Sequence, residues 1–212
     1  MVNDQLEDPC DGLEPQGRVD RPVRADAQRN VNSLLDAALA VFATSGVDAP
    51  VREIAVKAGV GVGTLYRHFP QRADLVAAVF RHEVDACADA APVLAAEYGA
   101  GEALARWMQR YADFIATKRG LASALHSGNP AFDSLPAYFQ KRLVPALRTL
   151  LDAAAAAGEA RADVDAYELL TAVANLCMQV DGGCPAPAHR MVALLFDGLR
   201  YGAMGSGDRS ID

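Results

Sequence analysis

The fold of this chain is decided by the stretch Ile54-Ala55-Val56-Lys57-Ala58-Gly59-Val60-Gly61-Val62-Gly63-Thr64-Leu65. Two short helices that meet at a sharp angle need a small residue where their backbones approach, and Ala55 supplies it. A glycine four positions later can adopt the positive φ of the turn, which is the role expected of Gly59. The spacing therefore predicts a helix-turn-helix, with an ordinary turn between two bundle helices as the alternative.

The apolar residues of this stretch predict which face of each helix is buried. The residues expected to hold the two helices together are Ile54, Ala58, Val60 and Leu65. The second helix then turns another set toward solvent, namely Gly61, Gly63, Thr64, Tyr66 and Arg67. An exposed helix can enter the major groove of DNA, which is about 12 Å wide. We therefore predict a DNA-binding surface on this face.

Helical periodicity extends over the rest of the chain. Apolar residues recur every three or four positions from Arg24 to Ser45, and Gly46 stands where a helix is expected to stop. Short helices at about 51–58 and 62–68 are followed by a longer one at about 72–90, before Pro92. The remaining sequence is helical throughout and ends with helices at about 165–180 and 187–203. No alternating strand pattern appears in the sequence, so we predict an all-α fold of about nine helices.

Composition divides the chain into a small and a large domain. Residues 1–22 are acidic and contain three prolines, which predicts a disordered tail. Residues 23–70 are expected to form a helix-turn-helix DNA-binding domain. Residues 71–205 are expected to form a helical domain for ligand binding and dimerisation, with 71–90 as the connecting helix. Residues 206–212 are expected to be a flexible tail.

Charge is distributed unevenly along the chain. The net charge is −7, yet residues 18–82 carry nine Lys or Arg against six acidic residues. A basic module on an acidic body fits a protein that places one end against phosphate. No apolar run reaches the roughly 18 to 20 residues of a membrane span and no signal peptide is recognisable, so we expect a cytoplasmic protein without membrane contact. The four cysteines and four histidines lack the spacing of a metal site, so no metal and no cofactor are expected.

The sequence resembles the TetR family of transcriptional regulators over about residues 24–80. The resemblance rests on three motifs: Val51-Arg52-Glu53-Ile54-Ala55, then Gly63-Thr64-Leu65-Tyr66-Arg67-His68-Phe69-Pro70, then Ala73-Asp74-Leu75. It implies a homodimeric regulator, usually a repressor, whose larger C-terminal helical domain binds an inducer. It also implies dimerisation through the last two long helices.

The resemblance assigns DNA contacts residue by residue. Thr64 and Tyr66 match base or phosphate contacts, His68 matches a phosphate contact, and Arg72 matches the basic residue that opens the fourth helix. The chain departs from the family pattern at Pro50 and Gly61, where a hydroxyl residue often caps a helix and contacts phosphate. Basic side chains are the candidates to compensate. The predicted DNA-binding set is Arg24, Arg52, Gly61, Gly63, Thr64, Tyr66, Arg67, His68 and Arg72.

Aromatic stripes in the C-terminal half mark candidate ligand-binding residues. Helices rich in aromatic residues are where a cavity would be lined, although such a stripe is also typical of plain core. A histidine beside the Gly128-Asn129-Pro130 break could orient a ligand or simply cap a helix. The predicted ligand-binding set is Trp107, Tyr111, Phe114, His126, Phe139, Leu143 and Cys177. The expected ligand is small and apolar or aromatic.

The sequence favours a ligand-responsive repressor that is released from a palindromic double-stranded DNA operator. Two alternatives remain open at this stage: a small helical enzyme, and a DNA-organising protein without an inducer. An enzyme is disfavoured because no nucleophile and base pair, metal set or phosphate-binding glycine loop is recognisable. A homodimer is expected because the apolar faces of the last two helices are wide.

Overall fold

The computed structural model describes residues 20–118, 121–125, 127–178 and 185–204. Within these ranges all regular secondary structure is helical, which confirms the predicted all-α class. The elements are α1 (Asp20–Ser45), α2 (Val51–Ala58), α3 (Val62–His68), α4 (Arg72–Glu97), α5 (Ala100–Lys118), α6 (Ala122–Leu125), the 3-10 helix η2 (Pro130–Phe132), α7 (Leu135–Ala156), α8 (Ala166–Met178) and α9 (Pro185–Met204).

Two helices are longer than the sequence suggested. Helix α1 begins at Asp20, so residues 20–22 of the expected tail belong to it. Proline at position 22 is compatible with this start because the first N–H groups of a helix have no partner within the helix. Helix α4 runs through Pro92 to Glu97 instead of ending near residue 90. Pro92 has no N–H to donate to the Ala88 carbonyl one turn earlier, yet the helix continues through it.

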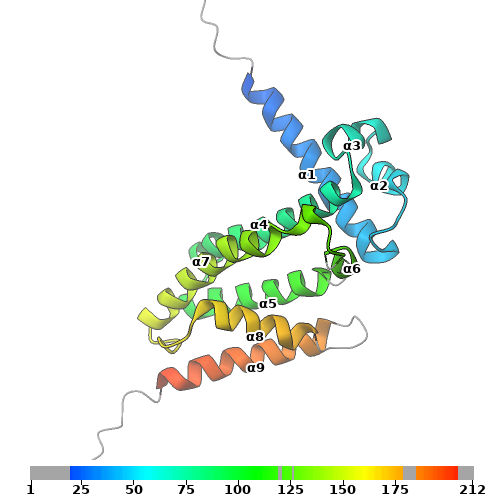
Figure 1. Cartoon of the computed structure of the whole chain (residues 1–212). Helices are drawn as coiled ribbons and strands as arrows, with labels where there is room; N and C mark the ends of the chain where they lie inside the picture. Colours follow the sequence, from blue (N-terminus) through cyan, green and yellow to red (C-terminus); the bar gives the residue numbers. More distant parts are fainter. Residues whose placement is uncertain (1–19, 119–120, 126, 179–184, 205–212) are drawn as a thin grey trace, which may run out of the picture.

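Helices α1, α2 and α3 form a small N-terminal unit at one end of the molecule (Figure 1). Its interior is built from buried side chains of all three helices and of the turn after α3: Leu34, Ala38, Val41, Phe42, Ile54, Ala55, Leu65 and Phe69. The predicted inward residues Ile54 and Leu65 are 0% and 1% exposed. The apolar spacing therefore identified the face that holds the helix-turn-helix together.

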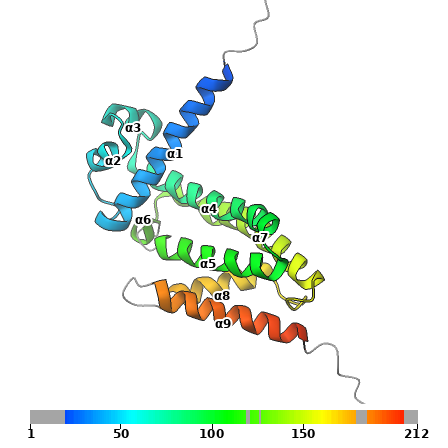
Figure 2. The ribbon, with the colours of Figure 1, turned by 180° about the vertical axis from the view of Figure 1, so that it is seen from behind.

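Helix α4 connects this unit to the C-terminal bundle. It packs against α1 at its beginning and against α5 and α7 along its length. Helix α5 lies inside the bundle, between α4 and α7 on one side and α8 and α9 on the other (Figures 1 and 2). Helices α8 and α9 form the outer layer of the bundle, away from the helix-turn-helix.

Candidate nucleic-acid interface and internal cavity

The turn between α2 and α3 has the predicted conformation. Gly59 has φ 68° and ψ 26°, the left-handed region in which a residue with a side chain is strained. The Val60 N–H donates to the Ala55 carbonyl at 3.0 Å, which closes the end of α2. The turn therefore fixes the angle between α2 and α3.

Helix α3 presents an exposed face to solvent. Leu65 anchors the helix from inside, whereas Tyr66 keeps 50% of its surface exposed. Arg67 and His68 are also exposed, and Thr64 is half-buried. This face carries hydroxyl, phenol, guanidinium and imidazole groups, which can all contact base edges or phosphates.

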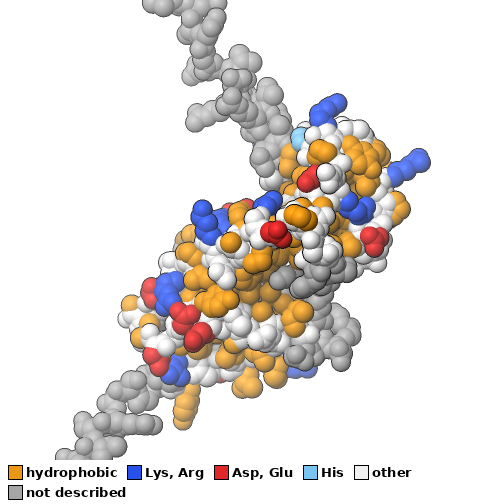
Figure 3. Space-filling view, viewed as in Figure 1, with side chains coloured by type: hydrophobic (Ala, Val, Ile, Leu, Met, Phe, Trp, Pro, Cys, Tyr) orange, Lys and Arg blue, Asp and Glu red, His pale blue; other side chains and the backbone are white. Residues whose placement is uncertain are grey.

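Neither helix of the motif has a side-chain cap at its N-terminus. Pro50 precedes α2 and Gly61 precedes α3, and neither position makes a side-chain hydrogen bond to the helix. Exposed cations stand nearby instead, at Arg52 and Lys57 on α2 and at Arg67 on α3. Figure 3 shows basic side chains around this end of the molecule. The Arg24 side chain lies outside the part of the chain that the structure describes.

Arg72, which the resemblance matched to a DNA contact, is held by the protein itself. Its guanidinium donates to the carbonyls of Val47 and Ala49 in the turn between α1 and α2. The same group lies over the Phe42 ring, 5.7 Å from its centroid. A half-buried guanidinium with these partners fixes the α1–α2 turn on α4. We therefore propose that Arg72 positions the DNA-binding unit.

This proposal separates the effects of two arginine substitutions. Arg72→Ala should lower the free energy of unfolding by about 1–3 kcal/mol, because two carbonyls lose a charged donor. Arg67→Ala should leave that free energy within about 0.5 kcal/mol and reduce the salt dependence of DNA binding by about one unit. Urea unfolding and DNA titrations at several salt concentrations measure both. A normal stability together with a reduced salt slope for Arg72→Ala would restore it as a phosphate contact.

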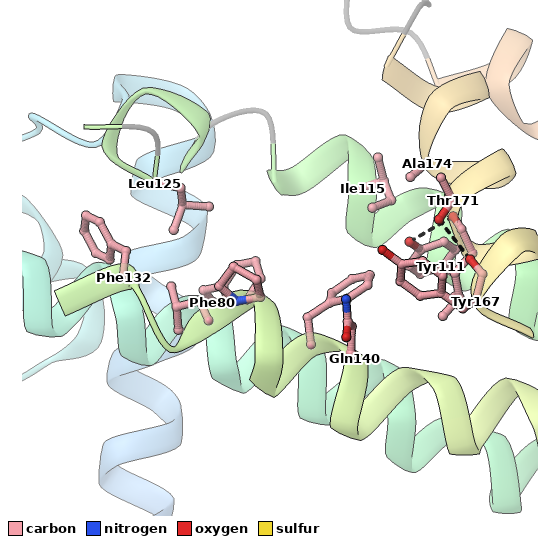
Figure 4. Close-up of a pocket in the computed structure, with 13 residues that line it drawn as sticks. Phe80, Tyr111, Ile115, Leu125, Phe132, Gln140, Tyr167, Thr171 and Ala174 are labelled. Carbon is pink, nitrogen blue, oxygen red and sulfur yellow. Dashed lines mark hydrogen bonds between the residues drawn. The ribbon is translucent and has the colours of Figure 1, made fainter. Parts of the chain in front are cut away.

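A cavity of about 370 Å³ lies between α4, α5, α7 and α8 (Figure 4). Its lining residues are Phe80, Tyr111, Ile115, Leu125, Phe132, Leu135, Pro136, Phe139, Gln140, Tyr167, Leu170, Thr171 and Ala174. None of these residues carries a carboxylate, imidazole or thiol. The wall is thus mostly aliphatic and aromatic, with a few amide and hydroxyl groups.

Hydrogen bonds occupy two of the hydroxyl groups in this wall. The Tyr111 hydroxyl donates to the Leu170 carbonyl at 3.3 Å, and the Thr171 hydroxyl donates to the Tyr167 carbonyl at 2.9 Å (Figure 4). Burial raises the pKa of the Tyr111 phenol, so this group stays neutral. The Gln140 side chain is exposed at the edge of the cavity.

The structure brings only some of the predicted ligand residues to the cavity. Tyr111 and Phe139 line it. The other described members of the set are buried and are not among its lining residues: Trp107, Phe114, Leu143 and Cys177. Trp107 is fully buried, and its indole N–H donates to the Cys87 carbonyl at 2.9 Å. His126 lies outside the described residues.

Sequence reasoning missed lining residues on α4, α8 and η2. These residues are Phe80 on α4, Tyr167 on α8 and Phe132 on η2. The aromatic character of each was visible in the sequence, but nothing in the spacing indicated that three separate elements converge on one cavity. The wall therefore follows from tertiary packing and not from a local motif.

Comparisons with known proteins agree with this arrangement. Residues 34–79 match the family model described as bacterial regulatory proteins, tetR family. Residues 99–201 match the model of the SbtR-like transcriptional regulator C-terminal domain. A TetR transcriptional regulator from Streptomyces coelicolor is 40% identical, with a TM-score of 0.71, over 80% of this chain and 97% of that protein. The chain belongs to the TetR family of transcriptional regulators.

Other relatives of this TetR-family regulator match over different lengths. The TetR regulatory protein from Mycobacterium vanbaalenii is 38% identical, with a TM-score of 0.65, over 84% of this chain and 99% of that protein. An HTH-type transcriptional regulator from Staphylococcus aureus is 36% identical over 64 residues, which are 30% of this chain and 35% of that relative. The chain therefore spans about a third of the length of that curated relative.

A more distant neighbour shares the fold of this TetR-family regulator. The regulator FadR from Bacillus subtilis, solved in complex with stearoyl-CoA, is 19% identical with a TM-score of 0.55. It covers 80% of this chain and 97% of its own.

None of the helices in the described ranges of the present chain combines the length and the apolar character of a membrane span.

Proposed function

We propose that this regulator is a homodimeric repressor that binds inverted-repeat DNA through α3 and releases it when a small apolar or aromatic ligand fills the cavity. The single observation that carries the proposal is the position of the cavity against α4, the helix that also holds the helix-turn-helix. Phe80 of α4 belongs to the cavity wall, and Arg72 at the start of α4 binds the α1–α2 turn.

Helix α7, which lines the cavity, also makes polar contacts with α4. Helix α7 lines the cavity with Phe139 and Gln140 and holds α4 with Tyr138 and Arg142. Both of the latter donate to Asp85 of α4, each at 2.7 Å. A displacement of α7 by a ligand would therefore be transmitted to α4 through well-defined contacts.

Helix α4 also carries contacts to α1. The His82 ring lies 3.1 Å from an Asp36 carboxylate oxygen, in addition to the Arg72 contacts with the following turn. A ligand can release DNA only by binding better to a conformer in which the helix-turn-helix is wrongly placed. Contacts from α4 to both α1 and the turn support α4 as the element that couples the two sites.

The chemistry of the cavity favours ligand binding over catalysis. Among the lining residues that the structure describes, none carries a carboxylate, imidazole or thiol that could act as a base or nucleophile. Aromatic rings make up a large part of the wall, and Tyr111 and Phe139 lie with ring centroids 6.2 Å apart. Such a wall suits a ligand that is apolar or aromatic, with few polar groups.

Selection of bound duplexes from random DNA tests the DNA-binding half of the proposal. The wild-type protein should enrich an inverted repeat whose half-sites are about one helical turn apart or somewhat more. Two protomers should bind each duplex. Enrichment of no common sequence, with binding that depends only on salt, would contradict sequence-specific regulation and favour a DNA-organising role.

Trp107 provides a test of the ligand-binding half. It is the only tryptophan of the chain, and its ring stacks on Tyr111 of the cavity wall with centroids 5.7 Å apart. Compounds that raise the melting temperature and release DNA should therefore change tryptophan emission. Phe139→Ala should weaken the binding of such a compound by about tenfold or more, since a large part of the cavity wall is removed.

Val93→Ala is a matched control for this test because Val93 is 53% exposed on α4 and is not among the lining residues. It should leave the affinity for the compound unchanged. The proposal would be contradicted by a compound that releases DNA, binds Phe139→Ala and wild type with equal affinity and leaves tryptophan emission unchanged. Such a compound would bind outside this cavity.

A further inference from the structure

Glycine alternates with valine at positions 59 to 63, but the fold explains only the first of the three glycines. Gly59 has the positive φ described above. Gly63 lies within α3, and its φ is not positive. A Cβ added to Gly63 would meet no atom within 4 Å. Glycine weakens a helix interior relative to alanine, so position 63 carries a cost that neither backbone geometry nor internal packing requires.

The missing side chain leaves bare backbone on the exposed face of α3. Residues three and four apart share a helix face, so Gly63 lies beside Tyr66 and Arg67. All three residues are exposed. The bare backbone at Gly63 thus lies on the same face as an aromatic ring and a guanidinium.

We propose that the bare backbone at Gly63 contacts the 5-methyl group of one thymine in each half-site of the operator, which makes Gly63 a specificity-determining residue. The inference rests on the proposed binding of α3 in the major groove. Among the groups that bases present there, the thymine methyl is the apolar one. A bare Cα beside an aromatic ring fits it, whereas a Cβ would take its place.

Two variants and one modified base test the inference. The duplex recovered by selection is titrated with wild type and Gly63→Ala, and each thymine is replaced in turn, at the equivalent position of both half-sites, by deoxyuridine, which lacks the methyl. Gly63→Ala should bind the unmodified duplex about tenfold or more weakly, because an extra methyl overpacks the contact. Its melting temperature should rise by about 2–4 °C, because alanine favours the helix.

The modified duplexes distinguish the methyl from the rest of the nucleotide. At one thymine position, deoxyuridine should weaken wild-type binding by about fourfold for each half-site replaced, the value of burying one methyl group. At that same position it should restore most of the affinity of Gly63→Ala. Such restoration also shows that the variant is folded, since a misfolded α3 would not recover through a change in the DNA.

Gly99→Ala is the control, because Gly99 is exposed, has open space at its Cβ position and lies at the start of α5, away from α3. It should bind DNA like wild type. Wild-type affinity of Gly63→Ala would overturn the inference, and so would a weakened variant that no deoxyuridine rescues, which would indicate a sugar or phosphate contact. A wild-type protein that enriches no sequence would overturn the proposed function itself, an outcome distinct from these two.

Discussion

Leu194→Glu is expected to convert the regulator into monomers that bind the operator about 100-fold more weakly or worse. Three residues of α9 form an exposed apolar stripe: Met191, Leu194 and Tyr201 are 42%, 64% and 80% exposed. Their spacing places them on one helix face. Figure 3 shows hydrophobic side chains along the edge of the molecule where α9 lies. We propose that a second copy of the chain covers this stripe.

The size of the effect follows from the loss of paired half-sites. A monomer binds one half-site only. In the dimer, binding of the first recognition helix raises the effective concentration of the second at its half-site, which increases the affinity by a factor of about 100 to 10,000. Sedimentation measures the assembly, and DNA titration measures the affinity. Leu194 is the better position for the charge than its neighbour Leu195, which is half-buried against the core and would destabilise the protomer when replaced.

Val93→Glu provides the control for this prediction, since Val93 is an equally apolar, exposed residue on α4. It should remain dimeric and bind DNA normally. If Leu194→Glu remained an intact dimer at micromolar concentration, the assignment of α9 to the dimer interface would be wrong.

Trp107→Ala should lower the free energy of unfolding by about 3–5 kcal/mol. The indole is fully buried, stacks on Tyr111 with an interplanar angle of 8°, and donates to the Cys87 carbonyl. Truncation removes the packing of α5 on α4 and leaves a void that the surrounding helices cannot fill. Trp107→Phe retains most of the volume and should cost less than half as much. Urea unfolding at equilibrium measures both.

A loss below about 1 kcal/mol for Trp107→Ala would contradict the assignment of Trp107 to the core. It would indicate that the indole borders empty space, as the sequence alone had suggested. The ligand affinity of Trp107→Phe would then be the next quantity to compare with that of Phe139→Ala.

The helix-turn-helix could be predicted in detail because its rules are local. Gly59 must accept a positive φ, and Ile54 and Leu65 must point inward, at positions that spacing alone defines. Arg72 could not be placed in the same way. Its residue type suggested phosphate, but the carbonyls that bind it belong to a turn about 25 residues earlier in the sequence.

The cavity wall shows the same limit of sequence reasoning. Trp107 and Tyr111 lie one turn apart on the same stripe of α5, yet only Tyr111 reaches the cavity. The difference depends on α4, whose Cys87 carbonyl holds the indole, and on α8, which leaves the space beside Tyr111. A helical period identifies a buried face, but packing against other helices decides which part of that face borders a cavity.

The most direct test of the central claim is the coupling between the cavity and DNA. A compound found by its effect on melting temperature is titrated into the protein with and without the selected duplex, and the duplex is titrated with and without the compound. The account predicts that the compound weakens DNA binding by about 5- to 150-fold and that DNA weakens binding of the compound by the same factor. A compound that fills the cavity while both affinities stay unchanged would contradict it.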